Sequence, residues 1–352
     1  MVSYNLLNFK KIVRFFLGLG ILLTAWLSTS AQQSDSIKTN PFFRDTTLVS
    51  FELTLNFEYF SKTQKTGAKY LPAIVRYKQA NSELKKIKIK FKTRLGARDS
   101  LNCSFPMLTL DFPKEKIYGT PFYGLNKVKL VSPCNLNDSL ANDDVLLEYA
   151  IYKSYQHLST FNLKVRLAEI TMHDSANLQP SVKFLAFFLQ DIDEMAGEKG
   201  GKIFKVANVP MGYCDQNSMQ NLSLFQFMIG NTNWSVSSLY NISFGSAPGM
   251  SLVPVPFEFS SCGLINNPSA RPAPHTPITK VSERLYIGTA KSLDQLKPSI
   301  THFLNNKGLI MNEFINLTSV STRSKNKALL YLDEFFNIIT NPEKVSIQIF
   351  EN

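Results

Sequence analysis

The chain has 352 residues, of which 44% are hydrophobic, and its 38 basic residues outnumber its 27 acidic residues to give a net charge of +11. This apolar fraction, which includes 27 phenylalanines, is sufficient for a packed core and excludes an intrinsically disordered chain. The basic balance favours anionic ligands such as phosphates, nucleotides or a polyanionic surface, without choosing among them.

Residues 1–31 have the pattern of a secretory signal peptide. Three basic residues come first, at Lys10, Lys11 and Arg14. The apolar run from Phe15 to Leu27 is shorter than the roughly 20 residues that a membrane-spanning helix needs. Thr29 and Ala31 are small residues at the −3 and −1 positions, so we predict cleavage after Ala31. We therefore expect an exported protein, periplasmic, at the cell surface or secreted, with no integral membrane span after cleavage.

The next part of the chain is predicted to be a flexible leader (residues 32–45) and then a β-rich region (residues 46–190). Apolar and polar side chains alternate from Phe51 to Tyr59, which is typical of a half-buried strand. Six further segments are predicted to be strands: Ala73 to Tyr77, Ile87 to Phe91, Met107 to Phe112, Lys127 to Val131, Lys164 to Met172 and Val182 to Leu189. A helix that begins near Asn142 or Asp143 and ends at about His157 interrupts them.

One predicted strand carries a row of four alternate lysines, Lys86, Lys88, Lys90 and Lys92. Such a row is typical of a solvated strand face or of a protected sheet edge. We do not predict nucleic-acid binding, because no aromatic platform accompanies the lysines on that face.

Residues 191–352 are predicted to be mainly helical. A helix is expected around Met219 to Ile229, and the tail from Ser292 to Asn341 is amphipathic. A section rich in proline and glycine separates them and ends at about Pro277. A β-rich first half and a helical second half, without alternation of strands and helices, predict an α+β protein with two lobes.

Four cysteines remain after the predicted cleavage: Cys103, Cys134, Cys214 and Cys262. Their spacing does not match a zinc site. An oxidising compartment permits up to two disulfides, with three possible connectivities. The simplest pairing joins Cys103 to Cys134, because both lie in the β-rich half.

Several common catalytic motifs are absent from the sequence. It has no Gly-x-Ser-x-Gly elbow and no phosphate-binding loop of the Gly-x-x-x-x-Gly-Lys-Ser/Thr type. The histidines are scattered, at His157, His173, His275 and His302. The common hydrolases and a histidine-rich metal site are therefore not predicted.

A set of residues in a particular order points to a different chemistry. Lys129 lies within a predicted strand, and Glu148 lies on the helix that follows. Asn233 lies in a Gly-Asn-x-Asn-Trp-Ser loop, Asn241 follows it, and Glu258 stands between two phenylalanines. Nucleotide-dependent phosphoryl transfer uses a strand lysine to hold phosphates, a helix glutamate to orient it, and loop side chains to position the nucleophile and metal.

This ordered set resembles the CotH-like kinases, a family of secreted atypical protein kinases. The resemblance covers the chain from about Phe51 to Ala290. The motifs that carry it are Cys-x-Phe-Pro-x-Leu-x-Leu-x-Phe (Cys103 to Phe112), Lys-Leu-Val-Ser-Pro-Cys (Lys129 to Cys134), Leu-Leu-Glu-Tyr-x-x-Tyr (Leu146 to Tyr152), Phe-x-Leu-Gln-Asp-Ile-Asp-Glu-Met-Ala (Phe187 to Ala196), the Gly-Asn-x-Asn-Trp-Ser loop, and Val-Pro-Phe-Glu-Phe-Ser-Ser-Cys-Gly (Val255 to Gly263). It implies a two-lobed atypical protein-kinase-like fold, with residues 46–190 as the N-lobe-like region and residues 191–352 as the C-lobe-like region. It also implies ATP and Mg²⁺ or Mn²⁺ as cofactors, and an extracytoplasmic protein as partner.

The resemblance assigns a role to each residue of the set. Lys129 would contact phosphate and Glu148 would be its partner. Asn233 would stand at the position of the catalytic acid, and Asn241 would be an amide on the metal side. Glu258 would stand at the position of the metal-binding acid.

The chain departs from the family pattern at three places. The family has aspartate in place of Asn233, an Asp-x-Asp-like pair in place of Glu258 and Ser260, and glutamate in place of Gln190. An amide cannot accept the proton of a substrate hydroxyl, and a single carboxylate is a poor magnesium site. We therefore predict a catalytically impaired, pseudokinase-like module that binds a nucleotide or a partner.

Two alternatives stay open. An active ATP-dependent kinase would use Glu258 for the metal and take its catalytic acid from Asp191 or Asp193. A structural envelope or adhesion module would instead bind an anionic polymer on the face that carries Lys86, Lys88, Lys90 and Lys92.

Overall fold

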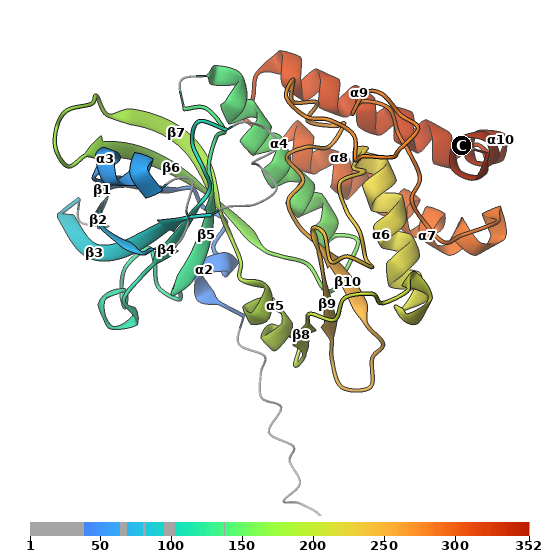
Figure 1. Cartoon of the computed structure of the whole chain (residues 1–352), viewed down its shortest axis with the longest axis horizontal. Helices are drawn as coiled ribbons and strands as arrows, with labels where there is room; N and C mark the ends of the chain where they lie inside the picture. The colour runs from blue at the N-terminus through green and yellow to red at the C-terminus, as the bar shows by residue number, and fades with distance from the viewer. Residues whose placement is uncertain (1–38, 64–68, 80–81, 95–102, 137, 352) are drawn as a thin grey trace, which may run out of the picture. The chain divides into compact units, whose positions relative to one another are not determined.

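Seven strands close into a barrel in the order β1-β2-β3-β4-β5-β7-β6 (Figure 1). The computed structural model describes residues 39–63, 69–79, 82–94, 103–136 and 138–351. The predicted signal peptide, residues 1–31, therefore lies outside the described residues, as does half of the predicted leader (residues 32–38). The described half of the leader is not a flexible segment, because it contains the short helix α2 (Pro41–Arg44), in which Phe42 and Phe43 are buried. The strands of the barrel are β1 (Val49–Leu55), β2 (Leu71–Lys78), β3 (Leu84–Thr93), β4 (Leu108–Asp111), β5 (Lys127–Val131), β6 (Val165–Asp174) and β7 (Val182–Leu189).

The barrel is closed by a parallel pair of strands. β1 pairs with β6 from Val49 opposite Ala168 to Leu55 opposite Asp174, whereas all the other neighbours in the barrel are antiparallel. This closed barrel, with a helical C-terminal region beyond it, shows that the predicted two-lobed kinase-like fold is wrong. Alternation of side chains identifies strands but not their partners, and the closing pair joins segments that are far apart in the chain.

Alternation along each strand fills the barrel with apolar side chains. Leu53, Val75, Ile89, Leu110 and Leu130 belong to this interior cluster. Aromatic rings complete it: the rings of Phe51 and Phe122, for example, meet edge to face with their centroids 5.5 Å apart. The side chains between these apolar residues point the other way. They include the alternate lysines of β3, which consequently lie on the outer face of the barrel.

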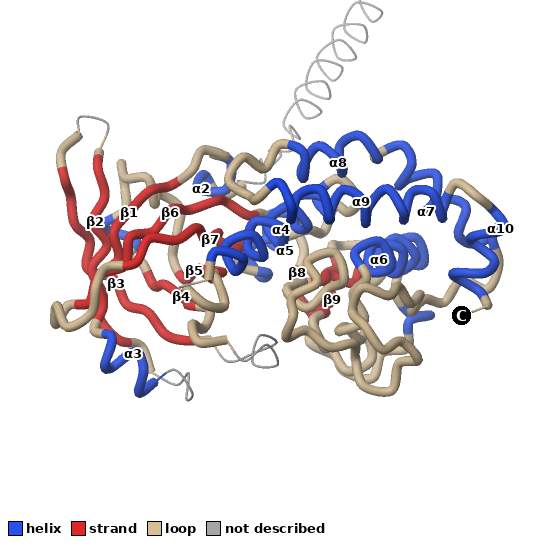
Figure 2. Tube along the Cα trace, turned by 90° about the horizontal axis from the view of Figure 1, so that it is seen from above, coloured by secondary structure: helices blue, strands red, loops and turns tan. Residues whose placement is uncertain are grey.

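Helix α4 (Ser139–Gln156) covers one part of that outer face (Figure 2). The Asp138 side chain caps the helix by accepting a hydrogen bond from the N–H of Leu140. α4 contacts β7, whose side chains enter both cores: Phe188 lies in the barrel, while Phe187 and Leu189 lie in the cluster that α4 shares with the C-terminal helices. The second half of β7, from Ala186 to Leu189, is thus buried on both faces and joins the two cores.

The remainder of the chain forms a small sheet and further helices. The antiparallel sheet has the order β10-β9-β8, from β8 (Lys202–Phe204), β9 (Ile242–Ser246) and β10 (Val253–Pro256). The longer helices are α6 (Gln216–Ile229), α7 (Leu293–Asn305), α8 (Lys307–Ile315) and α9 (Thr322–Ile339). The shorter helical elements are α2 (Pro41–Arg44), α3 (Phe57–Thr63), α5 (Ile192–Glu198), α10 (Pro342–Val345), the 3₁₀ turns η2 (Lys114–Lys116) and η3 (Met211–Tyr213), and the π-helical segment η4 (Ser346–Phe350).

Two local predictions can be compared directly with this structure. The disulfide between Cys103 and Cys134 is confirmed. The strand predicted from Phe51 to Tyr59 ends earlier, at Leu55, because the Asn56 side chain accepts a hydrogen bond from the N–H of Tyr59 at 2.9 Å and begins α3. None of the helices in the described part of the chain combines the length and the apolar character needed to span a bilayer.

Candidate functional site around Lys129

Strand β5 places Lys129 on the outer face of the barrel, on the side of the helical region. Its neighbours Val128 and Leu130 point into the barrel, so alternation directs the lysine outward. Across the sheet it lies between Thr109 of β4 and Leu189 of β7. The ammonium nitrogen lies 5.6 Å from the centre of the Phe257 ring, which comes directly after β10. A cation–π contact therefore joins the barrel to the segment that follows the small sheet.

A second cation and a carboxylate complete the immediate surroundings of Lys129. Arg94 follows β3, and its Nη2 atom lies 3.2 Å from Oε1 of Glu258. The Glu258 side chain is only 7% exposed and that of Arg94 is 21% exposed. This ion pair is shielded from water, so its charges act strongly on their neighbours.

The pKa of Lys129 is lowered to about 8 in these surroundings. Burial is the main cause, and the positive charge of Arg94 adds to it. The carboxylates of Glu258 and Asp191 oppose the shift, while Lys205 makes a smaller contribution in the same direction as Arg94. Lys129 and Arg94 thus both lie beside the well-buried carboxylate of Glu258, while Asp191 and Lys205 act on Lys129 with opposite signs.

Helix α4 holds the backbone on which Glu258 stands. The hydroxyl oxygen of Tyr152 accepts a hydrogen bond from the N–H of Glu258 at 2.9 Å, and Oε1 of Glu148 accepts one from the N–H of Phe259 at 3.1 Å. Glu148 and Tyr152 are four residues apart, so they project from the same face of the helix. Glu258 has a φ of 63°, a left-handed conformation that costs about 1–3 kcal/mol for a residue with a side chain. The two hydrogen bonds offset that strain and fix the position of the carboxylate.

The Asn233 loop is tied to the same segment. The Asn241 side chain donates a hydrogen bond from Nδ2 to the backbone oxygen of Asn233 at 2.9 Å. The backbone oxygen of Asn241 accepts a hydrogen bond from the N–H of Phe257 at 3.1 Å. The Asn233 side chain donates from Nδ2 to the backbone oxygen of Arg271 at 3.2 Å. Both asparagines therefore help to connect the loop with its neighbours.

The structure brings the five residues of the predicted set to one region of the molecule. Lys129, Asn241 and Glu258 lie at or beside Phe257, and Asn233 is one hydrogen bond further away. Glu148 is only 2% exposed and contacts the backbone of Phe259, whereas the carboxylates that act on Lys129 are those of Glu258 and Asp191. The roles given to these residues, including the pairing of Glu148 with Lys129, stay predictions.

Sequence reasoning missed two residues of this site, Arg94 and Tyr152. Arg94 comes two residues after Lys92, the last of the alternate lysines of β3, so the row could have been extended to it. Its partner Glu258 is 164 residues away, and no local pattern shows that contact. Tyr152 stands four residues after Glu148, and that helical spacing was a usable signal.

The donor set does not fit the Mg²⁺ or Mn²⁺ that the family resemblance implies. The carboxylate of Glu258 already forms an ion pair with Arg94 and lies near the ammonium of Lys129. In the part of the chain that the structure describes, no group of three histidines, cysteines, aspartates or glutamates is placed to hold a metal ion. A divalent cation at Glu258 would meet two positive charges, so the chemistry of this site favours anions.

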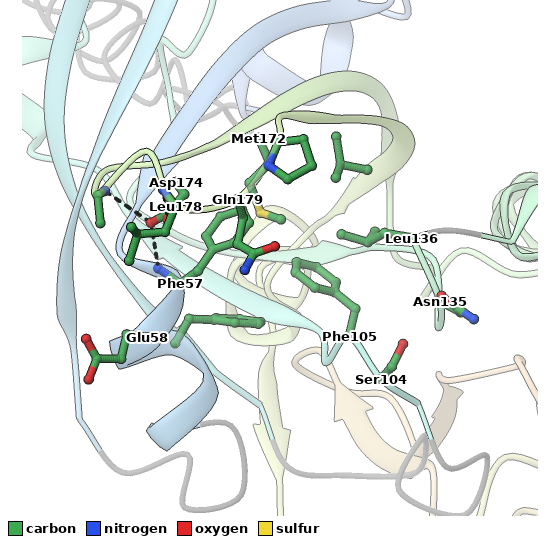
Figure 3. Close-up of a pocket in the computed structure, with 14 residues that line it drawn as sticks. Phe57, Glu58, Ser104, Phe105, Asn135, Leu136, Met172, Asp174, Leu178 and Gln179 are labelled. Carbon is green, nitrogen blue, oxygen red and sulfur yellow. Dashed lines mark hydrogen bonds between the residues drawn. The ribbon is translucent and has the colours of Figure 1, made fainter.

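A separate cavity of about 500 Å³ lies at the turn between β6 and β7, beside α3 (Figure 3). The rings of Phe57 and Phe105 line it, and Asp174 stands in its wall. Burial would raise the pKa of Asp174, but N–H groups that include those of Ala176, Phe57 and Leu178 donate to its carboxylate and lower the pKa. The carboxylate thus holds the turn and α3 together, and this cavity contains no residue of the predicted set.

Neither a protein-family model nor a curated protein sequence matches this chain. The resemblance to CotH-like kinases therefore rests on the motifs of this sequence and stays a prediction.

Proposed function

We propose that the protein is exported and binds the phosphate groups of a nucleotide between Lys129 and Arg94, without a divalent cation and without phosphoryl transfer. The observation that supports this most strongly is that two cations, Lys129 and Arg94, lie beside the well-buried carboxylate of Glu258. A phosphate group carries the opposite charge and can accept hydrogen bonds from both side chains.

The cost of burying Lys129 also supports an anion site. Its pKa of about 8 means that the ammonium is poorly stabilised by the protein alone. An anion bound beside the ammonium would favour the protonated form and raise the pKa. Groups whose pKa is shifted by burial and by neighbouring charges are frequent at functional sites.

The proposal that the protein does not transfer a phosphoryl group rests on Asn233. Its amide cannot act as a general base, and its Nδ2 atom already donates to the backbone of Arg271. The two aspartates considered as substitutes lie at the start of α5. Asp191 caps that helix by accepting a hydrogen bond from the N–H of Asp193 at 3.0 Å, and Asp193 itself is exposed. Of the two, only Asp191 contributes to the electrostatics of Lys129.

Thermal unfolding with and without ATP tests the proposed binding. We expect ATP to raise the unfolding midpoint equally in Mg²⁺ and in EDTA, because the ligand binds the folded chain and no metal is required. At a concentration of 100 times Kd the gain is about 2.7 kcal/mol. Lys129→Met should abolish the rise, while Lys127→Met, on the same strand, should retain it. A rise that needs Mg²⁺, or one that survives in Lys129→Met, would contradict the proposed site.

The proposed absence of phosphoryl transfer is tested by a separate measurement. Incubation with labelled ATP and generic acceptor proteins is expected to leave the label in ATP, in Mg²⁺ and in Mn²⁺ alike. Transfer that is lost in Asp191→Ala or Asp193→Ala would establish the active-kinase alternative instead.

A further inference from the structure

Strand β3 carries four basic side chains on its outer face, and with Lys127 of β5 they form what we call the basic face: Lys86, Lys88, Lys90, Lys92 and Lys127. Strand β4 lies between β3 and β5, and its Asp111 is the one acidic residue between Lys90 and Lys127 in the register of the sheet. All five side chains point away from the barrel interior, and all except Lys92 are exposed. Alternate residues of a strand lie about 6.6–6.8 Å apart, so the four lysines of β3 form a straight row about 20 Å long. Within the described residues, no carboxylate lies within 4.0 Å of the ammonium groups of Lys86, Lys88 or Lys90.

The basic face ends at the candidate site. Arg94 is the next alternate residue after Lys92, and its guanidinium pairs with Glu258. In the sheet, Lys92 lies opposite Thr109, and Thr109 lies opposite Lys129. A ligand that follows the row therefore approaches Lys129 without leaving the surface of the sheet.

We propose that the basic face docks an extended acidic segment of a partner protein. An extended polypeptide places alternate side chains at the same repeat as the lysines of β3, so a segment with an acidic residue at every second position matches them one to one. Strand β3 is flanked by Pro72 and Ile74 of β2, which lie opposite Lys90 and Lys88. These apolar neighbours give contact area to the side chains of a peptide between its carboxylates.

The surroundings of the row favour a polypeptide over a nucleic acid. Proteins that bind single-stranded nucleic acids combine positive charge with aromatic rings on which bases stack. The aromatic ring beside the row is that of Tyr70, and the ammonium groups of Lys92 and Lys127 lie 5.2 and 5.8 Å from its centre. That ring already binds two cations, so it is not a free platform for a base.

A fluorescent peptide of alternating glutamate and threonine is the probe for this surface, with a glutamine-for-glutamate peptide as its control. We expect the glutamate peptide to bind the purified protein, and its Kd to rise with salt. The double variant Lys88→Gln with Lys90→Gln should raise that Kd about three- to tenfold, as expected for the loss of two exposed charge pairs. The matched variant Lys297→Gln with Lys327→Gln removes the same charge from exposed positions on α7 and α9, and should leave the Kd unchanged.

Three results would overturn the inference. The first is an equal loss of affinity in both double variants, which would show attraction by net charge only. The second is tighter binding of oligothymidylate or polyphosphate than of the peptide, which would identify a different class of ligand. The third is equal binding of the glutamine peptide. Since Lys88 and Lys90 are outside the Lys129 site, ATP-dependent stabilisation in the same double variant separates failure of this inference from failure of nucleotide binding.

Discussion

At the scale of single residues, the feature that characterises the candidate site is an ammonium that the folded chain stabilises poorly. The pKa of Lys129 is about 8 in the folded protein, compared with 10.5 for an unperturbed lysine. Because the folded-state value is the lower one, burial of the protonated group destabilises the fold. This cost is about 3 kcal/mol. It is fully present below about pH 8 and disappears as the pH rises past 10.5, because the amine is then neutral in both the folded and the unfolded chain.

We therefore expect Lys129→Met to raise the free energy of unfolding at about pH 7 by about 1–3 kcal/mol, because the variant keeps the apolar stem and removes the buried charge. The gain should shrink at about pH 9.5, where the wild-type amine is largely neutral. Denaturant unfolding of both proteins at the two pH values measures this difference. Lys127→Met, at an exposed position of the same strand, should show no comparable dependence on pH. A variant that is less stable at both pH values would contradict this account.

The same pKa makes anion binding dependent on pH. Between about pH 7 and pH 9.5 Lys129 loses its proton, so phosphate or ATP should bind more weakly at the higher pH. Binding near pH 8 should also be accompanied by proton uptake, because the bound anion raises the pKa of the amine. Calorimetric titration in two buffers of different ionisation enthalpy detects that uptake. Affinity that does not change over this range would show that Lys129 is not in contact with the anion.

At the scale of elements, helix α4 determines where the Glu258 carboxylate lies. Tyr152 and Glu148 accept two consecutive backbone N–H groups from a segment that has no regular partner strand at that point. Because Glu258 has a left-handed backbone conformation, removal of an acceptor leaves a buried N–H without its partner in a strained segment.

We expect Tyr152→Phe to lower the free energy of unfolding by about 1–3 kcal/mol and to weaken ATP binding, since it displaces the ion pair between Glu258 and Arg94. Tyr155→Phe is the matched control, because Tyr155 lies in the same core three residues further along α4 and its hydroxyl pairs with Ser159, whereas the N–H of Glu258 donates to Tyr152. Denaturant unfolding and ATP titration of the two variants check the two effects. If Tyr155→Phe weakened ATP binding as much as Tyr152→Phe, the loss would reflect the packing of α4 in general.

At the scale of the whole molecule, the sequence predicts the elements better than their assembly. The strands Lys127 to Val131 and Val182 to Leu189 were predicted with their observed bounds, because alternation and runs of apolar residues are local signals. The closure of the barrel through β1 and β6 was not predicted, because it joins Val49 to Ala168 through backbone hydrogen bonds that depend little on side-chain identity. In the site, the segments that carry Lys129 and Glu258 were recognised from their motifs. The position of Arg94 could have been found by extending the row of alternate lysines, but its contact with Glu258 could not, because 164 residues separate the two.

The disulfide between Cys103 and Cys134 acts at this scale. It closes a loop of 31 residues and contacts Ala270 and Val281, which lie beyond the small sheet. From the length of that loop we expect the double variant Cys103→Ser with Cys134→Ser to lose about 3–4 kcal/mol of stability. Denaturant unfolding under non-reducing conditions gives that loss. Cys214→Ser with Cys262→Ser controls for removal of sulfur, since both thiols are free and buried, and only the first double variant should become insensitive to reducing agent.

The parallel pairing of β1 with β6 has a kinetic consequence. A chain that emerges with its N-terminus first presents β1 early, but the strand that must cover its open edge is complete only when Asp174 has emerged. Until then the edge of β1 opposite β2 exposes unpaired N–H and C=O groups, which can pair with other chains. The interval before β6 emerges is therefore a hazard for this chain, and a chaperone that covers the open edge of β1 during that interval would increase the yield of folded protein.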